Sequence, residues 1–312
     1  VARADVMSRD LTLGAIRRAL QELVVHFPVY RTYISARGRS AADESVFQQA
    51  LAGARGTLSE ADWPVLDYLQ QWLGGQTWRE RPVGQPRKIL KHACVRFQQL
   101  TSPAAAKAVE DTAFYRSAVL LSRNDVGFCT EQFSAPLADF HAANQQRLQT
   151  FPDNLLATAT HDHKRGEDCR ARLAVLSECA PWEVEQVQHW RRLAMPLRDD
   201  PGIPSAGDEL ILYQVLLGSW PLDLHDIDNY QQRLWQWQQK ALREAKLHSS
   251  WSAPNDLYEQ GVEAFLTRLL LDPVGLPLRT AIHAAAEAIA PAGALNGLAQ
   301  SLLRNTVPGV PD

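Results

Sequence analysis

The sequence has no long hydrophobic run and no excess of charge of either sign. No apolar stretch approaches the roughly 18–20 residues that a membrane-spanning helix needs, so we expect no membrane partner. Lysine and arginine together number 32, against 35 aspartate and glutamate residues, and the net charge is −3. Such an even balance gives no electrostatic signature for nucleic acid, which is therefore not expected as a partner.

Cysteines are few and are not clustered. The four cysteines, at positions 94, 129, 169 and 179, form no Cys-x-x-Cys pair, which excludes a zinc ribbon and a thioredoxin-type redox motif. A disulfide framework is unusual in a chain of 312 residues, so we expect free thiols in a reducing cytoplasm. Glycine-rich phosphate loops, Gly-x-Ser-x-Gly and His-Glu-x-x-His are also missing. The sequence therefore carries none of these motifs for nucleotide binding, ester hydrolysis or metalloprotease chemistry.

Helical periodicity dominates what is present. Apolar residues recur at steps of three and four over 13–27, 230–245 and 262–270, and Thr12 is placed to cap the first of these helices. Strand-like segments are short, at 28–34 and 155–160. More than ten helical segments against two or three short strands predict a mainly α fold.

The chain shows no repeat of 20–50 residues, which disfavours a helical solenoid. We predict two helical lobes with a few short strands. The expected divisions are a helical lobe at 1–155, a strand and loop carrying a polar motif at 156–170, a second helical lobe at 171–305, and the start of a final element at 306–312.

The densest group of polar side chains is Thr160-His-Asp-His-Lys-Arg-Gly-Glu-Asp168, directly after the second candidate strand. One interpretation is a carboxylate at the carboxyl end of a barrel strand, where barrel enzymes carry catalytic groups. The other is a helix N-terminus whose Glu167 and Asp168 complement the helix dipole. His161 and His163 could ligate zinc, but no third ligand follows at a fixed spacing, so no metal site is predicted.

A second polar group is Lys107-Ala-Val-Glu-Asp-Thr-Ala-Phe-Tyr-Arg116. It could be a solvated helix start, in which Lys107 and Asp111 form a weak surface pair. The neighbouring aromatic residues Phe114 and Tyr115 favour the wall of a site instead. Nine tryptophans are also present; some could stack on sugar rings, although most tryptophans belong to cores.

Seven motifs in order together resemble maltooligosyltrehalose synthase, of the α-amylase clan (glycoside hydrolase family 13). The resemblance runs from about residue 10 to the last residue. The motifs are Phe27-Pro-Val-Tyr-Arg-Thr-Tyr33, Arg96-Phe-Gln-Gln99, Ala106-Lys107 with Glu110-Asp-Thr-Ala-Phe-Tyr-Arg116, Thr160-His-Asp162 with Lys164-Arg165 and Glu167-Asp168, Leu212-Tyr-Gln214, Arg243-Glu-Ala-Lys246 and Pro308-Gly-Val-Pro-Asp312.

The resemblance implies a (β/α)8 barrel with large helical insertions and an isomerase of trehalose biosynthesis. That family converts the reducing-end α-1,4 linkage of a maltooligosaccharide into an α,α-1,1 linkage by intramolecular transglucosylation, through a covalent glycosyl-enzyme intermediate. The implied partner is a linear α-1,4-glucan, and no metal or organic cofactor is implied.

The resemblance also implies roles for individual residues. Asp162 corresponds to the third catalytic carboxylate, which stabilises the transition state, and His161 is its sugar-binding neighbour. Lys107 and Lys164 correspond to further substrate contacts. We add to these expected substrate-binding residues three neighbours in the same motifs: Arg165, Glu110 and Asp111.

Two departures and one omission accompany the resemblance. Ala108 stands where the family usually has glycine, and His163 where it usually has threonine. The family's nucleophile and general-acid motifs lie before the motif that begins here at Phe27. We therefore expect a fragment that holds one of three catalytic carboxylates and is inactive alone. The alternatives are a non-catalytic helical carbohydrate-binding or interaction module, and another glucanotransferase or hydrolase of the clan.

Overall fold

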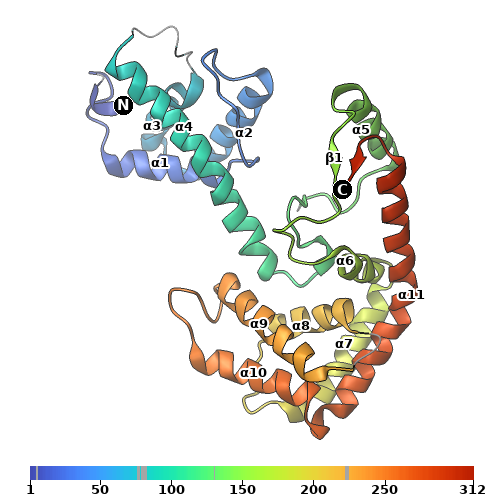
Figure 1. Cartoon of the computed structure of the whole chain (residues 1–312). Coiled ribbons are helices and arrows are strands. Elements are labelled where there is room, and N and C mark those ends of the chain that lie inside the picture. Colours follow the sequence, from blue (N-terminus) through green and yellow to red (C-terminus); the bar gives the residue numbers. More distant parts are fainter. Residues whose placement is uncertain (5, 76–77, 79–82, 130, 222–224) are drawn as a thin grey trace. The chain divides into compact units, whose positions relative to one another are not determined.

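The computed structural model describes residues 1–4, 6–75, 78, 83–129, 131–221 and 225–312. Its contacts divide the chain into two compact units, Val1–Val109 and Glu110–Asp312. Both consist mainly of helices (Figure 1), so the predicted mainly α fold is confirmed. The lobe limits predicted from the sequence stay predictions. None of the helices within the described residues is long and apolar enough to cross a membrane.

Four α-helices build the first unit around one apolar core. Thr12 caps the first helix as predicted, because its hydroxyl accepts a hydrogen bond from the Ala15 N–H. Phe47 and Phe97 in this core meet edge to face, and the partly buried Phe27 packs edge to face against both. The elements are η1 (Ala2–Ala4), α1 (Leu13–Val25), α2 (Ala41–Thr57), η2 (Glu60–Asp62), α3 (Trp63–Gln70), η3 (Gln71–Gly75), α4 (Gln85–Ala105) and η5 (Ala106–Glu110), which crosses into the second unit.

The strand predicted at 28–34 is wrong. These residues form no strand, and the nearest pairing is an isolated bridge between Ser35 and Gly38. The Ile34 N–H instead donates to the side-chain oxygen of Gln98 on α4, at 3.0 Å. A β-branched and aromatic sequence favours an extended backbone, but here a helix side chain supplies the hydrogen bond that a neighbouring strand would have supplied.

The second unit packs its helices around α8. This helix is apolar on nearly all sides, which is typical of a helix buried within a core. Trp190, Tyr213 and Trp220 are among the largest buried side chains of the second unit. The elements are η6 (Ala113–Tyr115), η7 (Leu121–Arg123), α5 (Leu137–Thr150), β1 (Leu155–Leu156), α6 (Glu167–Ala174), η8 (Val175–Glu178), α7 (Ala180–Ala194), η9 (Met195–Leu197), α8 (Ala206–Ser219), α9 (Ile227–Ala245), α10 (Asp256–Leu270), η10 (Pro273–Gly275), α11 (Leu276–Thr306) and β2 (Val310–Pro311).

The predicted strand at 155–160 is present but only two residues long. It pairs in parallel with β2, so that Leu155 faces Val310, and the two strands lie side by side near the C-terminus (Figure 1). The Asn154 carbonyl oxygen accepts from the Val310 N–H at 2.9 Å, and the Leu156 carbonyl oxygen accepts from the N–H of Asp312, just after β2, at 3.0 Å. Gly309 makes this approach possible, because a Cβ there would lie 2.6 Å from a carbon of Leu156. The pairing fixes the backbone just before the polar motif.

Gly275 offers a direct test of close packing in the second unit. A Cβ at this position would lie 2.1 Å from the Arg268 carbonyl oxygen, which belongs to the backbone of α10. We expect Gly275→Ala to lower the free energy of unfolding by about 1–3 kcal/mol, as overpacking does. Gly207→Ala is the matched control, since nothing lies within 4 Å of the added Cβ. Urea unfolding followed by circular dichroism measures both; equal stabilities would contradict this packing.

Candidate functional site

The polar motif after β1 presents two of its side chains to solvent. The side chains of His161 and Asp162 are 90% and 71% exposed, and the His161 Nε2 lies 3.3 Å from a carboxylate oxygen of Asp162. His163 instead folds back onto the turn, where its Nδ1 lies 2.9 Å from the Thr160 backbone nitrogen. The turn therefore exposes one imidazole and one carboxylate together, a hydrogen-bond donor beside an acceptor.

A buried carboxylate fixes the C-terminal end of this turn. Asp125 is fully buried and follows η7. Its two oxygens accept hydrogen bonds from the backbone N–H groups of Lys164 (2.8 Å) and Arg165 (3.2 Å). One of them also accepts from the Val126 N–H, at 2.8 Å. Backbone N–H groups stabilise a buried carboxylate strongly, so Asp125 connects two segments about 40 residues apart.

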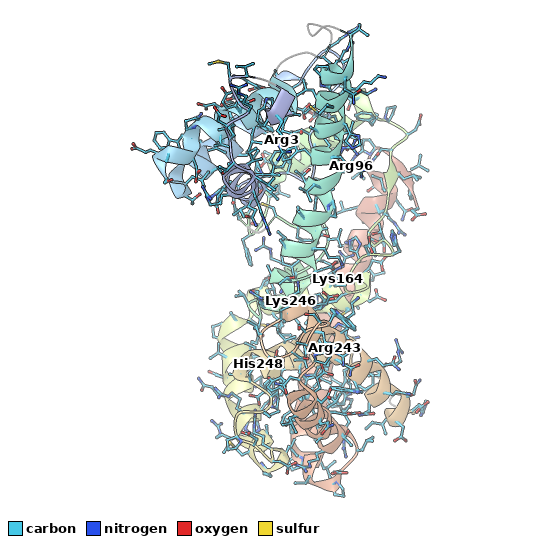
Figure 2. All side chains as sticks on the ribbon, turned by 90° about the vertical axis from the view of Figure 1, so that its left-hand side faces the viewer. Arg3, Arg96, Lys164, Arg243, Lys246 and His248 are labelled. Carbon is cyan, nitrogen blue, oxygen red and sulfur yellow. The ribbon has the colours of Figure 1, made fainter. Side chains whose placement is uncertain are left out.

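Lys164 and Asp111 meet in an ion pair. The Lys164 Nζ lies 2.6 Å from a carboxylate oxygen of Asp111, and both side chains are mostly buried. Lys164 is labelled in Figure 2, where it lies above Lys246 in the view. The structure thus brings together two of the predicted site residues, from the two polar motifs that the sequence singled out.

Glu110 and Arg165 are buried within the same region. Glu110 accepts a hydrogen bond from the Gly127 N–H at 3.1 Å, and Arg165 donates to the Asn124 carbonyl oxygen at 3.1 Å. Burial lowers the pKa of Arg165, and the nearby Cys169, Asp125 and Tyr115 oppose that change. In the described arrangement these two side chains position the loop, and their predicted contacts with substrate stay predictions.

Lys107 belongs to a different unit of the chain from the other predicted site residues. It is exposed on η5 (Ala106–Glu110) and belongs to the first unit, whereas the other site residues belong to the second. Its predicted contact with substrate stays a prediction.

Glu167 and Asp168 occupy the first turn of α6, as the helix-start interpretation requires. The Thr158 hydroxyl donates to a carboxylate oxygen of Glu167 at 2.7 Å. This hydrogen bond is the main cause that holds the pKa of Glu167 below its ordinary value. Among the described residues, no group of three or more His, Cys, Asp or Glu side chains could hold a metal ion.

Sequence reasoning missed Asn124 and Asp125. The Asn124 amide donates to the carbonyl oxygens of Phe114 (3.0 Å) and Ser117 (2.7 Å), which joins this loop to the second polar motif. The sequence Asn-Asp-Val-Gly127 is a recognisable turn signal. It could have located the loop, but not the backbone groups that Asp125 binds, because these come from a distant segment.

Comparison with known proteins gives a consistent result. No protein-family model matches the chain. A putative maltooligosyl trehalose synthase of Mycobacterium tuberculosis is 38% identical over 223 residues, which are 70% of this chain and 27% of that protein. The structure of maltooligosyltrehalose synthase from Arthrobacter ramosus aligns with a TM-score of 0.72 at 30% identity, over 96% of this chain and 35% of that one. A hypothetical maltooligosyl trehalose synthase from Sulfolobus tokodaii aligns with a TM-score of 0.72 at 26% identity, over 94% and 35%.

The chain therefore has the fold of a segment of enzymes that are named for trehalose formation. By sequence and by structure it is similar to a segment of the maltooligosyltrehalose synthases, and the resemblance predicted from its motifs is confirmed. The chain spans about a quarter of the length of the curated relatives and about a third of the solved structures that it matches.

Asp125 gives the site its most direct stability test. We expect Asp125→Ala to lower the free energy of unfolding by about 3–5 kcal/mol, because it leaves buried donors without an acceptor. Asp153→Ala removes an exposed carboxylate just before β1 and is the matched control, with an expected change within about 0.5 kcal/mol. Urea unfolding measures both variants. Similar small losses in the two would show that Asp125 does not anchor the turn.

Proposed function

We propose that this chain supplies the transition-state-stabilising carboxylate and a substrate-contacting face of a maltooligosyltrehalose synthase. The proposed reaction is the intramolecular transglucosylation of a maltooligosaccharide, an isomerisation in which a reducing-end α-1,4 linkage becomes an α,α-1,1 linkage. The observation that carries the proposal is the turn after β1, which exposes His161 and Asp162 together above a buried anchor. The similarity to trehalose-forming synthases supports it.

Asp162 has the chemistry that this role needs. Glycosyl transfer in the clan passes through an oxocarbenium-like transition state, and hydrogen bonds to sugar hydroxyls strengthen as that state forms. An exposed carboxylate accepts such bonds, and its negative charge favours the developing positive charge. His161 adds a donor 3.3 Å from Asp162, so one sugar ring could bind both groups through neighbouring hydroxyls.

The surrounding charged residues complete the proposed face. Lys164 lies two residues after Asp162 in the sequence. Its ammonium group is oriented by the ion pair with Asp111, at 2.6 Å. We assign Lys164 and Asp111 to substrate contact, and Arg165 and Glu110 to the positioning of the two loops as well as to the edge of the binding face. Lys107, in the first unit, is assigned to substrate contact from the resemblance alone. A preorganised set of donors lowers the cost of binding a flexible glucan.

We expect the 312-residue chain alone not to turn over maltohexaose. Retaining transfer needs a nucleophile and a general acid about 5–5.5 Å apart, and our proposal gives this chain only the third carboxylate. An anomeric-proton NMR time course should therefore show unchanged reducing-end signals. Loss of these signals without hydrolysis would mean that the chain is a complete enzyme and that Glu110, Asp111, Glu167 and Asp168 include its catalytic partners. Release of glucose or of disproportionated chains would instead identify a hydrolase or glucanotransferase.

The binding role of Asp162 is tested by substitution. We expect Asp162→Asn to weaken maltohexaose binding about five- to tenfold, because a charge-assisted hydrogen bond becomes a neutral one. Asp153→Asn, also exposed and in the preceding loop, should leave binding unchanged. Titration calorimetry measures both. Binding that does not depend on Asp162 would favour a non-catalytic carbohydrate-binding module, and absence of any binding would contradict the proposed face.

A further inference from the structure

A cavity of about 360 Å³ in the second unit adjoins the turn that carries the site. Its wall includes Lys164, Arg165 and Gly166, which follow Asp162 in the sequence. The opposite parts come from the end of α8 and from α9, which contribute Ser219 and Arg233. The function proposed above uses Lys164 but gives this cavity no role.

The described lining carries cationic side chains and no carboxylate. Lys164 is paired with Asp111, whereas Arg233 is exposed and forms no hydrogen bond or ion pair within the described part of the chain. Burial raises the pKa of the Cys169 thiol and of the Tyr230 phenol, which also line the cavity. Both groups therefore stay neutral near pH 7 and add no negative charge to balance the cations.

Arg165 supplies a second, independent observation. The residue is only 9% exposed, yet no described residue accepts a hydrogen bond from its buried Nε–H. One of its terminal nitrogens donates to Asn124, so the guanidinium is held in place. A buried donor of a charged group that lacks an acceptor is costly, so Arg165 brings to the cavity wall a hydrogen-bonding capacity that the described residues leave unused.

We propose that this cavity binds an oxyanion of the phosphate class, either inorganic phosphate or the phosphate group of a monoester. Arginine presents a planar fork of donors that matches phosphate oxygens in pairs, and the lysine ammonium adds a point charge. Arg165 and Arg233 would donate from the buried wall and from the exposed side, and Lys164 from the site turn. The bound anion would lie next to the segment that carries Asp162. This inference shares Lys164 with the sugar-binding role proposed above but does not depend on that role.

The test uses the 312-residue chain, inorganic phosphate and glucose 1-phosphate, with titration calorimetry at low ionic strength. Arg233→Gln removes an exposed cation of the cavity without disturbing the buried core. Lys240→Gln removes an exposed cation of the same helix that does not line the cavity, and is the matched control. We expect Arg233→Gln to weaken phosphate binding about tenfold and Lys240→Gln to leave it unchanged.

Each outcome is decisive. Tighter binding of glucose 1-phosphate would identify a monoester as the ligand, and tighter binding of inorganic phosphate would identify the free ion; either supports the site if Arg233→Gln weakens it. No phosphate binding, or equal weakening in both variants, would overturn the inference. Maltohexaose affinity, measured on the same variants, should not change with Arg233→Gln. If it falls while phosphate does not bind, the cavity is a sugar subsite instead.

Discussion

The buried carboxylate of Asp125 is the interaction on which the candidate site depends. A charge without contact to water is tolerated only when donors surround it, and here the donors are backbone N–H groups from its own loop and from residues 164 and 165. The two segments must meet for the carboxylate to be satisfied. The preceding turn, with His161 and Asp162, can then be exposed without being disordered, because its far end is fixed.

Local patterns predicted the helices well and the strands poorly. The helix at 13–25 carries its own information, in its apolar spacing and in the cap at Thr12. A strand has no such independence, since its hydrogen bonds lie on another segment. Residues 28–34 have strand-like composition but bind a helix side chain. Leu155–Leu156 become a strand because Val310, more than 150 residues later, pairs with them.

Some features of the candidate site could also be predicted from local sequence, and others depend on the tertiary structure. The sequence identified His161, Asp162 and Lys164 as a polar group after a short strand, and the structure shows the first two exposed. It could not show that Arg165 and Glu110 are buried, because burial depends on which loop covers them. The contribution of Asp125 was hidden for the same reason: a turn signal locates a loop, but the partner of a carboxylate is a property of the tertiary structure.

The net charge of the chain does not predict the electrostatic potential at a particular site. A net charge of −3 over 312 residues argues against a large basic surface. It does not limit the local potential, because neutralising carboxylates can lie far from the cations they balance. In the cavity beside the site, Asp111 and Asp125 engage Lys164 and the adjacent backbone from outside the lining, whereas Arg233 has no such partner in the described chain. An anion bound there would neutralise the charge of Arg233, which the described residues leave unpaired, and would lie beside the segment that carries Asp162.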